Sequence, residues 1–416
     1  MTQAMAPGGV VTAFPLNGSA AKTGVVRLAA TRLTLTNFRN YAHVRFEPGG
    51  APVVLTGANG AGKTNALEAL SFLTPGSGLR RARLGDISRR DAGDTSEVST
   101  LGRPWAVAAI VEGGVTPVNI GTGLENAHAS KRQVHVDGEA QRAMASLSQH
   151  FAAHWLTPQM DRLFLDGSQE RRRFLDRLVF GFDPAHAGRI TGYTHAMRER
   201  AKLLGDGKFD DAWLSALEDT MATRGVSVAA ARLDVAQRLA AVCENMDGPF
   251  PASRLAIDGL AEQWLATCPA LEVEDRLRAA LKASRGRDAE AGCVGGGIKG
   301  RLPHQSDLLV TYAAKGMSAG QCSTGEQKML LVGLVLAAAR LSARDEDRVP
   351  VLLLDEVAAH LDARHREALF AQVINLGCQA WFTGTDAELF APLNGRAKFY
   401  QVDAGSVHET DGAPRA

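Results

Sequence analysis

The chain has 416 residues, of which 45% are hydrophobic, enough for one large domain and a smaller one, each with its own core. Its formal net charge is +1, from 46 basic and 45 acidic side chains, so any contact with a polyanion must come from local clusters. The five cysteines show neither C-x-x-C pairs nor a histidine spacing suited to zinc, which excludes a disulfide framework and indicates reduced thiols.

Residues 1–29 are rich in Ala, Gly and Thr and are expected to form a disordered tail. They lack the charged start and apolar core of a signal peptide, so we expect a cytoplasmic protein. The longest apolar helix-like run, residues 329–339, is about half of the roughly 20 residues that a membrane span needs. It predicts a buried helix and no membrane association.

The first lobe is expected to be α/β and to begin with short strands. Alternating apolar and polar residues predict strands over 31–36, 44–47 and 52–56, so that an antiparallel hairpin leads into the next motif. Further strands at 107–111, 118–121 and 133–136 suggest a mixed β layer.

Residues 57–64 match G-x-x-x-x-G-K-[ST] at every fixed position, between an apolar strand and a helical pattern. The glycines turn successive backbone amides toward phosphates, Lys63 reaches the β and γ oxygens, and Thr64 offers its hydroxyl to Mg²⁺. A chance match in a glycine-rich chain is the alternative, but the flanking strand and helix favour an ATP site. Nucleotide binding is assigned to Gly57, Asn59, Gly60, Gly62, Lys63, Thr64 and Asn65, and Lys63 is also assigned a catalytic role.

The character of the chain changes at residue 184. Long amphipathic stretches with few turn signals, such as 211–246, predict a helical arm inserted over 184–300. An ordinary compact helical subdomain is the alternative. Residues 285–300, with three consecutive glycines, are expected to form a flexible return connection. The remaining divisions are 30–183 and 301–404, as the two parts of the head, and a tail over 405–416.

The run 349–354 is apolar and ends in Asp355 and Glu356, as expected for a buried parallel strand that delivers carboxylates at its C-terminal end. Asp355 would hold Mg²⁺ and Glu356 would polarise the attacking water. A strand followed by a solvated acidic turn is the alternative. This motif lies almost three hundred residues after the phosphate loop, which requires a large insertion in one nucleotide-binding lobe.

Between these motifs, residues 321–328 place a Ser-x-Gly turn directly before the apolar helix. Ser323 can cap that helix, and its free amides make an anion site, although a merely well-capped helix has the same sequence. The order of parts resembles the ATP-binding-cassette (ABC) superfamily, in which the signature serine and glycine of one subunit close over the γ-phosphate bound by the other. The resemblance implies this role for Ser323, Gly325 and Glu326.

Two further segments extend the resemblance. Residues 359–362 resemble the loop that crosses the dimer interface, which makes His360 an interface or surface residue rather than a catalytic one. Residues 382–386 follow a strand-like run, and Thr385 falls where many cassette ATPases have a histidine. Thr385 is still a candidate to hydrogen-bond a phosphate or water.

More specific segments are similar to the RecF family of bacterial ATPases, over residues 30 to 400. They are 35–41, 77–80, 155–161, 171–176, 323–327 and 382–386. The resemblance implies an SMC-like head with a short arm, ATP-dependent homodimerisation, and binding to DNA at gaps or junctions upstream of RecA loading with RecO and RecR. It also makes Arg39 a nucleotide contact and Gln159 the lid glutamine that senses Mg²⁺ and γ-phosphate. Residues 301–307 depart from the family pattern at Leu302 and Gln305.

Arginines gather in two places, independently of the family. One cluster, after the phosphate-loop helix, contains Arg80, Arg81 and Arg83, which we assign as DNA contacts; the other spans residues 171–177. Guanidinium clusters suit phosphate contacts and carry no base-reading pattern. The alternative is a solvated helical face paired with acids such as Glu170 and Asp176.

The sequence therefore predicts an ABC-type ATPase head with a parallel sheet core, which dimerises on ATP, binds DNA and hydrolyses ATP weakly to release it. One rival is the ATPase subunit of a membrane transporter, which shares the three motifs but has no long helical insertion. A second rival is a scaffold that uses the nucleotide as a structural ligand without turnover.

Overall fold

The computed structural model describes residues 25–89, 103–126, 129, 131–207, 210–246 and 248–413. Its central sheet has the strand order β17-β16-β4-β15-β14-β9, and every pair is parallel except β16 with β17. The strands are β4 (Val53–Thr56), β9 (Ala153–Leu156), β14 (Val351–Leu354), β15 (Ala380–Gly384), β16 (Lys398–Asp403) and β17 (Ser406–Thr410). All residues of β4, β9, β14 and β15 are buried, which explains why these strands are mostly apolar; the buried exceptions are Thr56, His154 and Thr383.

A second sheet has the order β3-β2-β5-β6-β7-β8. Its strands are β2 (Ala29–Phe38), β3 (Tyr41–Phe46), β5 (Trp105–Glu112), β6 (Val118–Leu124), β7 (Gln133–Val136) and β8 (Glu139–Ala140). The layer expected to be mixed is antiparallel at every pair. Buried and exposed residues alternate along β5 because one face of this sheet packs on the core. Helix α1 (Lys63–Ser71) contacts β2 of this sheet and β15 of the central one.

The opposite face of the central sheet is covered mainly by helices, and its core includes residues of α4 (Ser168–Phe182), α9 (Thr324–Asp345) and α10 (Ala363–Leu376). The run 330–339 in α9 is entirely buried, as the sequence predicts. A three-stranded antiparallel sheet of β10 (Ser253–Asp258), β11 (Asp307–Tyr312) and β12 (Met317–Ser318) stands beside these helices. The short helix α3 (Leu147–His150) precedes β9.

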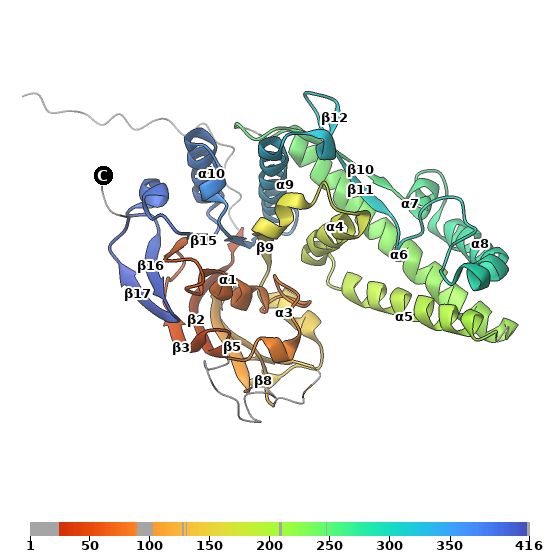
Figure 1. The fold of residues 1–416 in the computed structure, drawn as a ribbon, viewed down its shortest axis with the longest axis horizontal. Coiled ribbons are helices and arrows are strands. Elements are labelled where there is room, and N and C mark those ends of the chain that lie inside the picture. The colour runs from red at the N-terminus through yellow and green to blue at the C-terminus, as the bar shows by residue number, and fades with distance from the viewer. Residues whose placement is uncertain are drawn as a thin grey trace, which may run out of the picture.

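The arm consists of α5 (His186–Gly205), α6 (Asp211–Glu244), α7 (Leu260–Leu265) and α8 (Ala270–Ala291), and it projects away from the two large sheets (Figure 1). With 34 residues, α6 is about 51 Å long. Met221 and Val226, in its first half, join the core of the arm, whereas Val235 and Leu239 join the core of the head. One helix thus connects the two parts. The boundaries at 184 and 300 stay a prediction.

The two expected tails and the expected helical arm all contain strands where the structure describes them. Of the expected N-terminal tail, residues 26–27 form β1, which pairs with β13 (Arg348–Val349), and β2 begins at Ala29; residues 1–24 lie outside the described part. The expected C-terminal tail contains β17, which adds an edge strand to the central sheet through an antiparallel turn. The arm contains the strand β10, held by its ladder with β11.

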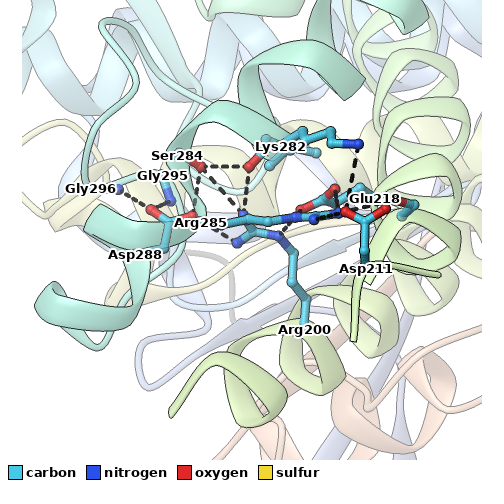
Figure 2. Close-up of polar contacts among 11 residues, drawn as sticks. Arg200, Asp211, Glu218, Lys282, Ser284, Arg285, Asp288, Gly295 and Gly296 are labelled. Carbon is cyan, nitrogen blue, oxygen red and sulfur yellow. Dashed lines mark hydrogen bonds and ion pairs between the residues drawn. The ribbon is translucent and has the colours of Figure 1, made fainter. Parts of the chain in front are cut away.

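The expected flexible connection over 285–300 begins as helix, since α8 continues to Ala291. A buried ion network holds this last part of α8 against the arm. Arg200 of α5 pairs with Glu218 of α6 at 2.9 Å and with Asp288 of α8 at 2.7 Å (Figure 2). Asp288 also accepts hydrogen bonds from the backbone amides of Gly295 and Gly296, at 2.8 and 2.9 Å. The Asp288 carboxylate therefore attaches the glycine loop to the arm, and the amino-acid composition of the loop gives no sign of this contact.

All five cysteines lie in the described part and are free thiols. None of the helices described is both long and apolar enough to cross a bilayer.

Candidate functional site

The phosphate loop turns from β4 into α1 with three glycines at positive φ: Gly57 (147°), Gly60 (81°) and Gly62 (122°). A Cβ at position 57 would lie 2.2 Å from the Val402 carbonyl oxygen, and one at position 62 would lie 2.5 Å from Asn40 Nδ2. Both positions therefore need glycine for space as well as for conformation. Asn59 and Gly60 are exposed at the tip of the loop.

Lys63 begins α1 and folds back over the loop. Its Nζ donates to the carbonyls of Gly57, at 2.8 Å, and Ala58, at 3.0 Å, and lies 3.8 Å from Glu356 Oε1. The side chain is only 5% exposed. The ammonium group is thus held at the mouth of the loop, where a bound phosphate would take the place of these carbonyl contacts.

Thr64 and Asp355 meet although 291 residues separate them, because β14 and the phosphate loop end at the same edge of the sheet. Thr64 Oγ1 donates to Asp355 Oδ1 at 2.8 Å. Two neighbouring oxygens of an octahedral Mg²⁺ with bonds of 2.0–2.1 Å lie about 2.9 Å apart, and Mg²⁺ prefers oxygen ligands. Both the donor set and its spacing therefore fit Mg²⁺, which would supply positive charge to the phosphates.

Glu356 follows Asp355 in a left-handed backbone conformation, with φ of 56°, which is uncommon for a residue other than glycine. Its amide donates to Thr383 Oγ1 at 2.9 Å, and the same hydroxyl donates to Asp355 Oδ1 at 2.7 Å. The conformation turns the Glu356 side chain away from the strand axis and toward Lys63, where it is 26% exposed. Both groups assigned to catalysis are therefore within reach of one ligand.

Thr383 is the site residue that sequence reasoning missed. It belongs to the segment 382–386, which carries part of the family resemblance, but the motif points to Thr385, which is exposed beyond the end of β15. The parallel register pairs Leu354 with Phe382, so that Thr383 comes level with Asp355. A hydroxyl side chain at the end of an otherwise apolar, strand-like run was the signal available in the sequence.

Residues after β2 brace the phosphate loop from outside. Asn40 Nδ2 donates to the Ala61 carbonyl at 2.7 Å, and Tyr41 OH donates to the Gly62 carbonyl at 3.0 Å. Asn65 donates to Asn40 Oδ1 at 2.7 Å. Arg39, expected to contact the nucleotide, forms a bidentate pair with the buried carboxylate of Glu68 on α1, at 2.7 and 2.8 Å. Its guanidinium therefore orients α1 in this structure.

The signature turn caps α9 as the sequence predicts. Ser323 and Glu326 form a capping box, and Lys315 also pairs with Glu326. The hydrogen bonds from Lys315 and Ser323 lower the pKa of Glu326 to about 2. Ser323 and Gly325 are exposed, and, apart from its chain neighbours and its own helix, no described residue comes within 4 Å of a Cβ built at Gly325. Ser323 and Glu326 hydrogen-bond to each other, and Glu326 also to Lys315, so the outer surface of the turn is open to a ligand.

Gln159 is exposed in the 3₁₀ helix Pro158–Arg162, directly after β9. This turn lies close to Asp355, because β9, which precedes it, pairs with β14. The Asp355 amide donates to the carbonyl of Leu156, the last residue of β9, at 2.9 Å. His360 is exposed, consistent with a surface position. Leu302, one of the departures from the family pattern, is fully buried in the core of the arm.

The two arginine clusters differ. Arg80, Arg81 and Arg83 are exposed; Arg80 donates to Asn65 at 2.7 Å, and Arg81 pairs with Glu170 at 2.8 Å. In the second cluster Arg171 forms a bidentate pair with Asp307 at 2.7 and 2.9 Å, and Arg172 donates to the Ser306 carbonyl at 2.7 Å. These two arginines join α4 to the start of β11 and the residue before it, which is a structural role.

A phosphate loop at the end of one parallel strand, an Asp-Glu pair at the end of another and a capped helix behind a serine-glycine turn define the fold of an ABC-type ATPase head. The family model described as RecF/RecN/SMC N terminal domain matches residues 29–406. The chain is 46% identical over 386 residues to the DNA replication and repair protein RecF of Mesorhizobium japonicum, covering 92% of this chain and 98% of that protein. It is 47% identical over 379 residues to RecF of Allorhizobium ampelinum, covering 90% and 97%. The chain belongs to the RecF family, which decides against the transporter subunit.

Solved structures agree on the fold. The recombination mediator protein RecF of the RecFOR pathway, in the form RecF-ATPrS, superposes with a TM-score of 0.79 at 18% identity, covering 93% of this chain and 99% of that one. An Smc head domain from Pyrococcus furiosus, bound to the C-terminal domain of ScpA, gives a TM-score of 0.50 at 13% identity, covering 92% and 96%. These likenesses place the chain among RecF and SMC heads by fold alone.

Proposed function

We propose that this protein is an ATP-gated DNA clamp of recombinational repair and replication-fork maintenance. One observation carries the proposal: Lys63, Thr64, Asp355 and Glu356 converge in one chain, whereas the signature turn stands exposed at the start of α9 with an open outer surface. A second copy can therefore supply Ser323 and Gly325 to the γ-phosphate, which ties ATP binding to dimerisation.

ATP and Mg²⁺ are the ligands. The loop amides and Lys63 hold the phosphates, Thr64 and Asp355 hold Mg²⁺, and Glu356 polarises the attacking water. Gln159, Arg39, Asn65 and Thr385 belong to the rim of the nucleotide site in this proposal. Hydrolysis removes the γ-phosphate that bridges the two copies, so the dimer opens and the enzyme is a slow switch.

DNA is the partner, bound at gaps and single-strand to double-strand junctions. Arg80, Arg81 and Arg83 supply phosphate contacts without reading bases. Family resemblance adds cooperation with RecO and RecR in loading RecA, and the relatives are described as DNA replication and repair proteins. A structure of a relative in the form RecF-ATP supports ATP as the nucleotide.

The test combines light scattering for association, gel shift on gapped and fully double-stranded DNA, and an ATPase assay with and without DNA. Glu356→Gln should keep ATP-driven association and DNA retention while turnover falls about 100-fold or more, because only the water-activating group is lost. Lys63→Met should lose ATP binding, association and DNA retention together.

Two outcomes contradict the proposal. Unchanged turnover in Glu356→Gln would remove the catalytic assignment. Equal DNA binding by the parent with and without ATP, on both kinds of DNA, would remove the gating. A parent chain that associates on ATP but shows no turnover, even with DNA, would point to the scaffold in which nucleotide is a structural ligand.

A further inference from the structure

A pocket of about 590 Å³ lies between the loop after α1, the turn after β9 and helix α4. Its lining includes four arginines and three aromatic side chains, which are Arg80, Arg81, Arg173, Arg177, Trp155, Phe174 and Phe180. Small-molecule sites typically measure about 300–1,000 Å³, so the pocket has room for a single nucleotide and none for a duplex.

Arg177 lines the wall of the pocket, and its guanidinium makes few hydrogen bonds to other residues. Its guanidinium lies over the Trp155 ring at 4.4 Å and near the Phe174 ring at 5.3 Å. It donates to the Trp155 carbonyl at 3.3 Å and to Met160 Sδ at 3.8 Å, and its Nε has no protein partner. Within the described residues no carboxylate pairs with it. Burial and the charge of Arg81 lower the pKa of Arg177 to about 9, so it stays protonated at neutral pH.

The acidic side chains of the pocket are already neutralised. Asp176 pairs with Arg232 of α6 at 2.7 Å, and Asp166 with Arg162 at 3.4 Å. Glu170, at the start of α4, holds both Arg81, at 2.8 Å, and Arg173. Arg177 is therefore the cation of this pocket that still needs an anion, and Glu170 is the one carboxylate that an incoming anion would displace from two further arginines.

We propose that this pocket binds the phosphate group of a single nucleotide, with Arg177 at its wall and with Arg81 and Arg173 released to it from Glu170. A planar guanidinium gives phosphate paired, charge-assisted hydrogen bonds, and the aromatic side chains give a base a surface for stacking. The nucleotide comes either from a DNA strand or from solution; its identity as DNA rests on the proposed function.

A ligand in the pocket can affect the ATP site through the short 3₁₀ helix Pro158–Arg162. Gln159 and Met160 line the pocket, and Met160 contacts Arg177 directly. The strand before this turn pairs with β14, which ends at Asp355. A phosphate on Arg177 therefore contacts the segment that carries the lid glutamine, and we expect it to change the ATPase rate through Gln159.

The test uses full-length protein carrying Lys63→Met, so that the phosphate loop contributes little, without ATP. Calorimetry measures binding of thymidine monophosphate, thymidine and an unphosphorylated dT10 oligonucleotide, whose phosphates are all internal. Thymidine monophosphate should bind and thymidine should not. Adding Arg177→Lys should weaken binding about tenfold, because a lysine cannot offer the paired donors. Adding Glu170→Gln should tighten it, because Arg81 and Arg173 lose their competing carboxylate.

Arg238→Lys is the matched control, since Arg238 also lies over a ring, Phe182 at 4.9 Å, outside the pocket. It should leave the affinity unchanged. Competition by dT10 assigns the ligand to DNA, and binding of the monophosphate alone assigns it to a free nucleotide; both support the phosphate site. Failure of the monophosphate to bind, or unchanged or weaker binding in the Glu170→Gln variant at this partly exposed position, overturns it even if Arg177→Lys does not fold. These binding measurements need neither ATP nor a dimer. The proposed phosphate site can therefore be supported even if the proposed ATP-gated clamp is refuted.

Discussion

Thr383 shows how much of the site depends on one hydroxyl group. It donates to Asp355 and accepts from the Glu356 amide, so it orients the proposed metal ligand and holds the left-handed turn of the proposed catalytic carboxylate at the same time. Such a partner fixes which carboxylate oxygen is left for the cation. Thr383 is a positioning residue, since the side chain that would touch ligand is that of Asp355.

Thr383→Val keeps the shape of the side chain and removes both hydrogen bonds. We expect the ATPase rate to fall about 10- to 100-fold and the Mg²⁺ concentration for half-maximal rate to rise, because Asp355 loses its orienting donor. The ATPase rate measured against Mg²⁺ concentration checks this. Thr220→Val, on the exposed surface of the arm helix α6 and outside the nucleotide site, is the control and should change neither quantity. Equal effects of the two substitutions would contradict the role given to Thr383.

At the scale of elements, α9 has two uses for the same turn. Its capping box, made by Ser323 and Glu326, begins the helix, and the exposed side of that turn is what a second copy would meet. The helix behind it is buried over most of its length, so the turn is held rigidly. A site built on the start of a packed helix keeps its geometry better than one on a loop.

Ser323→Arg should leave ATP binding by the single chain intact and block ATP-driven association, because the bulky side chain occupies the surface of the turn. Loss of the cap should also reduce stability by about 1 kcal/mol. Asp210→Arg provides the comparison, since Asp210 caps α6 by accepting from the Trp213 amide, away from the signature. Light scattering with ATP should show that association is lost in Ser323→Arg and kept in Asp210→Arg, and urea unfolding measures the stability of both variants. Normal ATP-driven association of Ser323→Arg would refute the composite site.

At the scale of the whole molecule, buried polar groups join the arm to the head. Asp176 of α4 and Arg232 of α6 pair at 2.7 Å. Burial alone would raise the pKa of Asp176, but the Arg232 charge and the His186 hydrogen bond lower it instead. On the central sheet, His154 of β9 is 2% exposed, and neither ring nitrogen has a hydrogen-bond partner among the residues that the structure describes. These groups make stability depend on pH in a way that composition does not reveal.

Burial, with the charge of Arg177, lowers the pKa of His154 to about 3. The unfolded chain binds this proton near pH 6.5, whereas the folded chain does not, so stability falls as the pH drops below about 6.5. At pH 5 the loss is about 2 kcal/mol relative to pH 7. His154→Leu should remove that loss, which urea unfolding at the two pH values measures. Parallel changes in parent and variant would contradict this.

The local motifs were predictable because their geometry is local. The phosphate loop, the Asp355-Glu356 pair and the cap at Ser323 each follow from residues within a few positions, and the strand before or helix after each was predicted too. Where only composition was available, prediction failed. Residues 285–291 were expected to be flexible and are helical, because Asp288 finds partners in α5 and in the glycine loop.

The sequence by itself determined the chemistry of this chain: which groups are available to hold phosphates and Mg²⁺, and the family. Tertiary structure alone decided which groups meet. The parallel register of β14 and β15 places Thr383 beside Asp355, and the turn after β16 brings the Gly405 amide within 3.3 Å of the Ala61 carbonyl on the phosphate loop. Arg81 reaches Glu170 across the pocket in the same way. Such contacts depend on the packing of segments far apart in the chain. No short sequence motif specifies that packing, so these contacts could not be predicted from the sequence.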